Sequence, residues 1–108
     1  MTATVSHPIT MEKTPVLVWD LSIEGMGAEM LDEKTPIIEG MNLPLIRLDL
    51  PMGPIEATGI VRSVRRENVL EKTQLGIEFI DGSEHYRDKI LDYILNMDFP
   101  PETVMGRP

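Results

Sequence analysis

Short runs in which apolar and polar residues alternate, separated by Pro and Gly, fill most of the chain up to about residue 80. A strand points successive side chains to opposite faces, so a period of two indicates a strand with one buried face. Ile46, Leu48 and Leu50, for example, alternate with charged residues and are expected to share the inner face. Dense turn residues between such short runs are typical of an antiparallel meander or barrel.

The runs that predict strands are bounded by turn residues and are rich in Val, Ile, Leu or Thr: 2–6, 15–22, 28–31, 43–50, 55–66 and 75–79. Gly59 predicts a bend or bulge within the long fifth run. In the second run, Leu17, Trp19 and Leu21 make a wholly apolar face, which is expected to point inward. On this alternation Trp19 is a core residue rather than a platform for a ligand.

The pattern changes to helical periodicity after residue 83. Tyr86, Ile90, Ile94 and Met97 recur at spacings of three and four, which predicts an amphipathic helix to about Asn96. Ser83 is expected to be the helix N-cap. Surplus apolar residues could cover a homo-oligomer interface: Leu91, Leu95, Met97 and Phe99. We expect one domain over residues 1–98 and a flexible C-terminal tail over 99–108.

Composition narrows the classes of function. The chain has 108 residues, which suits one domain, and a net charge of −8, which opposes binding to nucleic acid polymers. It has no Cys and no apolar run of the roughly 20 residues that a membrane span needs. The N-terminus lacks the pattern of a secretory signal, so we expect a cytoplasmic protein with no membrane contact.

Residues for catalysis or metal binding are not grouped in the sequence. His7 and His85 are isolated, and the acidic residues are scattered without a paired-carboxylate pattern. No Gly-rich loop between a strand and a helix suggests a nucleoside triphosphate site. We therefore expect no catalytic residues, no metal, no resident cofactor and no enzymatic activity.

The stretch from Asp20 to Gly25 carries the strongest candidate for a site. Asp20 and Ser22 are expected to protrude together from the solvent side of a strand, and Gly25 lets the backbone turn without a side chain. A carboxylate can accept two hydrogen bonds side by side, which matches the N1–H and N2–H edge of guanine. The alternative interpretation is a turn that merely ends the strand, because Asp, Ser and Gly are common turn residues.

These residues resemble the PilZ family of bacterial cyclic di-GMP receptors, whose motif is Asp/Asn-x-Ser-x-x-Gly. Asp20, Ser22 and Gly25 match that motif. Further matching segments are Gly59-Ile-Val-Arg62, Leu75-Gly-Ile-Glu-Phe79 and the helix with Arg87, Ile90, Tyr93 and Ile94. The resemblance implies an all-β fold, a six-stranded antiparallel barrel with one C-terminal helix, and a role in motility, pili or biofilm control.

One part of the family pattern is missing. Members that bind cyclic di-GMP usually carry Arg-x-x-x-Arg just before the first strand, whereas here Lys13 is the one Lys or Arg before Asp20. The chain is either a divergent member or one that begins just inside its domain. If the fifth run is a regular strand, Arg62 and Arg66 share a face and could help to hold phosphate. The alternative is that they pair with Glu67 or Glu71 on a solvated strand end.

Two functions remain open at this level, beside the weaker option of an unrelated small barrel whose turn merely mimics the motif. In the first, the chain binds cyclic di-GMP through Asp20, Ser22 and Gly25, with Arg62 and Arg66 as weaker candidates, and relays its level to a protein partner. In the second, the chain keeps the barrel but acts as an adaptor through protein–protein contacts without the nucleotide. The retained motif favours the receptor, and the missing arginines favour the adaptor.

Overall fold

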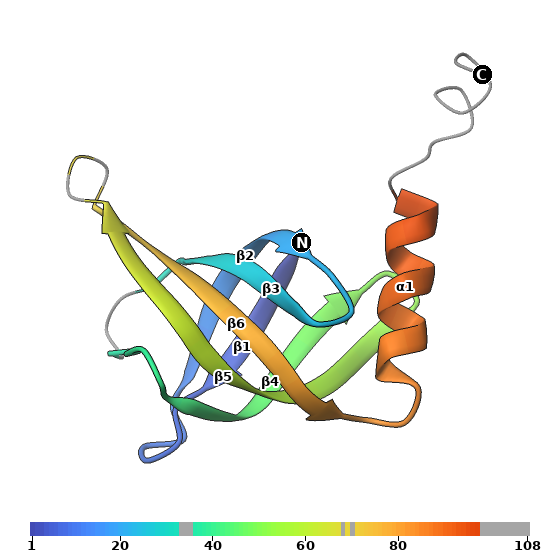
Figure 1. The fold of residues 1–108 in the computed structure, drawn as a ribbon, viewed down its shortest axis with the longest axis horizontal. Helices are drawn as coiled ribbons and strands as arrows, with labels where there is room; N and C mark the ends of the chain where they lie inside the picture. Colours follow the sequence, from blue (N-terminus) through green and yellow to red (C-terminus); the bar gives the residue numbers. More distant parts are fainter. Residues whose placement is uncertain (33–35, 68, 70, 98–108) are drawn as a thin grey trace.

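Six antiparallel strands close into a barrel that one helix covers at its end (Figure 1). The computed structural model describes residues 1–32, 36–67, 69 and 71–97. The elements are β1 (Thr2–Ser6), β2 (Lys13–Leu21), β3 (Gly25–Met30), β4 (Asn42–Leu50), β5 (Gly53–Glu67), β6 (Lys72–Gly82) and α1 (Tyr86–Met97). Around the barrel the strands follow the order β1-β2-β3-β6-β5-β4. The all-β barrel with one C-terminal helix is confirmed, and the expected tail at 99–108 lies outside the described residues.

The barrel interior is filled by the inward residues of every strand. On β4 the alternation is as expected, because Ile46, Leu48 and Leu50 are buried while Arg47 is exposed. Most of the core consists of aliphatic side chains and Met, with Phe79 and Tyr86 as its aromatic members. Such side chains suit a small barrel, whose lumen is only wide enough for side chains to fill.

The inner face of β2 is the reverse of the expected one. Val16 and Val18 are buried, whereas Leu17 is 39% exposed and Trp19 is 59% exposed. The register of β2 on β3 shifts between Val18 and Asp20, so Trp19 is the extra residue of a β-bulge and both Trp19 and Asp20 are exposed. The expectation of a core Trp19 was wrong because the other apolar positions of the strand, Val16 and Val18, take the inner face, and the bulge then turns Asp20 to the same outer side as Trp19.

Further bulges bend the long strand β5. Its register on β6 shifts between Thr58 and Gly59, which confirms the irregularity expected at Gly59, and again between Val61 and Ser63. Bulges increase the local twist and re-aim side chains. The second bulge matters for the site, because it sets the direction of the arginine side chains that follow it.

Helix α1 lies across one end of the barrel, next to β5 (Figure 1). Ile90 is fully buried against the barrel, and the ring of Tyr86 meets Phe79 edge-on with centroids 6.3 Å apart. Leu91 and Leu95 face solvent. Among the described residues, no helical segment combines the length and the apolar character that crossing a membrane requires.

Ser83 does not cap the helix as expected. Its hydroxyl accepts a hydrogen bond from the backbone N–H of Glu56 at 3.3 Å, and its own N–H donates to the Glu56 carbonyl at 2.8 Å. Ser83 therefore joins the end of β6 to β5. The helix begins at Tyr86, after His85, whose φ of 61° lies in the left-handed region.

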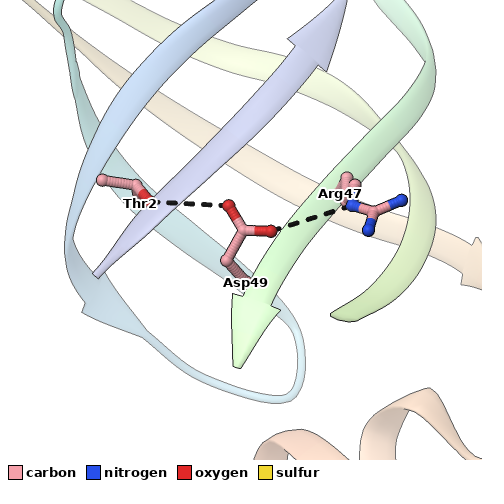
Figure 2. A network of polar contacts seen from close by, with 3 residues as sticks. All are labelled: Thr2, Arg47 and Asp49. Atoms are coloured by element: carbon pink, nitrogen blue, oxygen red, sulfur yellow. Dashed lines mark hydrogen bonds and ion pairs between the residues drawn. The ribbon is translucent and has the colours of Figure 1, made fainter. Parts of the chain in front are cut away.

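The pairing of β1 with β4 closes the barrel. Ala3 pairs with Leu48 in this seam. On the outer wall, the hydroxyl of Thr2 on β1 donates a hydrogen bond to Oδ2 of Asp49 on β4 at 3.5 Å. The Nε atom of Arg47 lies 3.7 Å from Oδ1 of the same carboxylate, so Asp49 contacts both residues (Figure 2). Exposed contacts of this length contribute little to stability, so the seam is held chiefly by backbone pairing and by the buried side chains beneath it.

Candidate functional site

The candidate motif lies on the hairpin between β2 and β3. The backbone N–H of Ser22 donates to the Gly25 carbonyl at 2.9 Å. The Ser22 hydroxyl also donates to that carbonyl at 3.4 Å and accepts from the N–H of Glu24 at 3.2 Å. Ser22 thus holds the turn, as the alternative interpretation expected. The carboxylate of Asp20 is exposed and makes no hydrogen bond or ion pair with any residue that the structure describes.

Gly25 is required by close packing rather than by the turn alone. It is the first residue of β3 and pairs with Glu78 on β6. A Cβ on Gly25 would collide with the backbone carbonyl of Ile77. A side chain at this position would therefore push β3 away from β6 and separate the two strands beside the motif.

A cavity of about 470 Å³ lies on the outer wall beside this hairpin. Its lining comes from β2, β3, β5, β6 and the hairpin turn: Trp19, Asp20, Ser22, Glu24, Gly25, Met26, Gly27, Arg62, Ser63, Arg65, Gln74, Leu75, Gly76, Ile77 and Glu78. Four of the residues proposed from the sequence are thus brought together, namely Asp20, Ser22, Gly25 and Arg62. Arg66 is not among the lining residues.

The three arginines of β5 have different surroundings. The Nε of Arg62 lies 2.6 Å from Oε1 of Glu78, so its charge is already paired across the strands. Arg66 donates to the hydroxyl of Thr73 at 3.1 Å. Arg65 lines the cavity, and its side chain makes no hydrogen bond or ion pair within the described part of the chain. The expectation that Arg62 and Arg66 share a face assumed a regular strand, and the bulge between Val61 and Ser63 breaks that alternation.

Trp19 lines the cavity, although it was expected in the core. Three further residues line it without having been expected at the site: Glu24, Arg65 and Glu78. The indole of Trp19 lies over Gly27, because a Cβ on Gly27 would be 2.8 Å from the Cζ2 atom of that ring. Trp19 is outward because Val16 and Val18 take the inner face of β2, and the bulge turns Asp20 outward beside it. The one signal in the sequence was the position of the single Trp directly before the motif.

The charges around the cavity are mixed. The carboxylates of Asp20, Glu24 and Glu78 line it together with the guanidinium groups of Arg62 and Arg65. No group of three or more His, Cys, Asp or Glu side chains that could hold a metal occurs among the described residues. The arrangement offers a free acceptor, a free guanidinium and an open aromatic surface, which together suit the binding of a planar polar molecule.

The sequence matches no family model and no curated protein, so the comparisons that find likeness are those between structures. The PilZ domain of YcgR from Escherichia coli, solved with c-di-GMP, superposes with a TM-score of 0.74 at 16% identity, covering 99% of this chain and 88% of that one. The structure of E. coli YcgR in complex with c-di-GMP gives a TM-score of 0.76 at 16% identity, covering 98% and 45%. The Bacillus subtilis inhibitor of motility, MotI/DgrA, gives 0.73 at 17% identity, covering 99% and 48%.

The chain spans a little under half the length of the second and third of these proteins. At such low identity the likeness concerns the fold, and it extends over nearly the whole of this chain. The resemblance expected from the motif and from the later strands is thereby confirmed in three dimensions. The chain has the fold of a PilZ domain.

Proposed function

We propose that this chain is a cytoplasmic, non-enzymatic signalling module that binds cyclic di-GMP and relays its level to a protein partner that controls motility, pili or biofilm. The observation that carries the proposal is the unpaired carboxylate of Asp20 at the mouth of a cavity that four strands build. The likeness to a PilZ domain solved with c-di-GMP supports the same ligand.

In this proposal Asp20 reads the guanine edge. Its two oxygens accept hydrogen bonds from N1–H and N2–H of the base, an arrangement that is stronger than a neutral pair because the acceptor is charged. Ser22 is a positioning residue, since its hydroxyl holds the turn that directs Asp20 outward. Gly25 keeps β3 close to β6 and leaves the approach to the motif open.

The phosphates of the ligand need a positive partner, and Arg65 is the candidate that requires no rearrangement. Its guanidinium lines the cavity and has no hydrogen-bond or ion-pair partner among the described residues. Arg62 lines the cavity too, but it would have to be shared with Glu78. No bond is made or broken in the ligand, so its effect is a shift in conformation or in affinity for the partner.

The second candidate function is an adaptor that keeps the barrel and does not bind the nucleotide. Three carboxylates face two guanidinium groups around the cavity, which is an unfavourable balance for a ligand with two phosphates. The chain also has no Arg before Arg47, and an ammonium group such as that of Lys13 supplies neither a planar fork of donors nor a stacking face.

Calorimetric titration of the full chain with cyclic di-GMP separates the two functions. For the receptor we expect micromolar affinity, and we expect Asp20→Ala to weaken it roughly 10-fold to 100-fold, the usual loss for a hydrogen bond to a charged group. Asp88→Ala is the matched control, because it removes an exposed carboxylate from the start of α1, away from the cavity. Absence of binding by the unaltered chain would reject the receptor and favour the adaptor.

A further inference from the structure

The single tryptophan of the chain lies open on the wall of the cavity. Trp19 is 59% exposed, although large aromatic side chains normally bury most of their surface. Leaving an indole in water forgoes a large hydrophobic gain, because aromatic residues contribute strongly to cores and interfaces. Trp19 lies beside the free carboxylate of Asp20 in a concave site, so its exposed ring borders the cavity.

The backbone holds the indole in place. A Cβ built on Gly27 would lie 2.8 Å from Cζ2 and 3.0 Å from Cη2 of Trp19, so the six-membered ring rests on the bare backbone of β3. The sheet therefore covers one side of the ring, and the other side is left open. The bulge turns Trp19 and Asp20 to the same outer wall, which sets an aromatic plane next to a hydrogen-bond acceptor.

We infer that Trp19 is the platform on which a purine base of the bound nucleotide stacks, while Asp20 reads the edge of that base. The inference rests on the proposed function and deepens it by assigning how the base is recognised. Stacking is tolerant of base identity because every base has a π-face. Selection of guanine over adenine then falls to Asp20, because the matching edge of adenine carries a ring acceptor in place of the N1–H donor. Trp19 would also provide a stacking face in a chain that has no arginine before the motif.

The test uses the natural fluorescence of the chain, since Trp19 is its one source of indole emission. We expect cyclic di-GMP to quench this emission with the same dissociation constant that calorimetry gives. Trp19→Ala should weaken binding roughly 10-fold to 100-fold, the usual loss when one base loses its aromatic partner. Trp19→Phe should recover most of that loss, because it keeps a ring without the indole nitrogen. Cyclic di-AMP should bind the unaltered chain at least 10-fold more weakly.

Leu17→Ala is the matched control, because Leu17 is an exposed apolar residue of the same strand that does not line the cavity. It should leave affinity unchanged. If the chain binds cyclic di-GMP but Trp19→Ala keeps its affinity within twofold, the platform is rejected and the receptor stands. If the unaltered chain shows no binding, both are rejected. Circular dichroism of Trp19→Ala should match that of the unaltered chain, since the side chain is outside the core.

Discussion

Glu78 neutralises one of the two guanidinium groups at the cavity. Its Oε1 lies 2.6 Å from Nε of Arg62, across the pairing of β5 with β6. Glu78→Gln keeps the shape of the side chain, removes one negative charge from the wall and frees Arg62 for an anion. We expect this change to strengthen binding of cyclic di-GMP by roughly twofold to fivefold, a modest gain because the pair is solvated and screened. Calorimetry of the variant beside the unaltered chain measures it.

The control for this change is Glu56→Gln, which alters an exposed glutamate on β5 that does not line the cavity. It should leave affinity unchanged within error. Weaker binding by Glu78→Gln would contradict the expectation and would mean that Glu78 serves to hold Arg62 in its binding position.

At the scale of single residues, the sequence predicted the motif better than its surroundings. The outward positions of Asp20 and Ser22 were expected and are found. The outward position of Trp19 and the pairing of Arg62 with Glu78 were not expected. Trp19 is outward because the Val residues of β2 take the inner face. Its position beside Asp20 and the position of Arg62, in contrast, depend on bulges, where one extra residue changes the direction of those that follow. A two-residue period cannot reveal a bulge before the partner strand and its register are known.

At the scale of elements, α1 is attached to the barrel through few buried side chains. Ile90 has no exposed surface, and Leu95 on the same helix is 54% exposed. We expect Ile90→Ala to lower the free energy of unfolding by about 2–4 kcal/mol, because it removes buried methyl groups and leaves a cavity that the barrel cannot fill. Urea denaturation followed by far-ultraviolet circular dichroism measures the change.

Leu95→Ala is the control on the opposite face of α1, and it should cost less than about 0.5 kcal/mol. A comparable loss in both variants would show that the outer face of the helix is buried too. That result would support the homo-oligomer interface expected from Leu91 and Leu95, and the size of the particle in solution should then be measured.

Element types were predictable because most of the chain has clear periodicity. The strands and the helix lie close to their expected ranges, although β3 begins earlier, at Gly25. Ser83 was misassigned because Ser before an amphipathic run is a typical N-cap. Its contacts with Glu56 come from a strand far away in sequence, which local patterns do not report.

At the scale of the whole molecule, the net charge of −8 repels an anionic ligand. Salt weakens repulsion between the chain and the ligand as well as attraction to Arg65, and carboxylates outnumber guanidinium groups at the cavity. We therefore expect the affinity for cyclic di-GMP to stay within about twofold, or to rise, between low salt and roughly 0.3 M NaCl. Fluorescence titrations at several salt concentrations measure this.

The outcome that contradicts this expectation is a steep fall in affinity with salt, which would indicate a clamp made mainly of charge–charge contacts. Arg65→Ala provides the comparison. It should bind more weakly at every salt concentration, and its affinity should rise more clearly with salt, because the local attraction is gone.

The assembly of the site was the hardest part to foresee. The number of strands and the closing helix followed from the pattern and from the resemblance to the PilZ family. The cavity depends on β3 pairing with β6, which brings Gly27, under the Trp19 indole, opposite Gly76, which lies against the Ser63 hydroxyl. Contacts between residues so far apart in sequence depend on the closed topology and not on any local motif.

Closure of the barrel also limits how another protein can dock. Each strand from β1 to β6 has a partner strand on both sides. In the described part of the chain, backbone without a ladder partner is thus confined to strand ends, such as the part of β5 beyond Val61 that pairs with β6 but not with β4. In the proposed relay, a partner would therefore bind chiefly to side chains on the outer wall, to the hairpin turns or to the helix. Such surfaces can be redesigned residue by residue without disturbing the hydrogen-bonded ring beneath them.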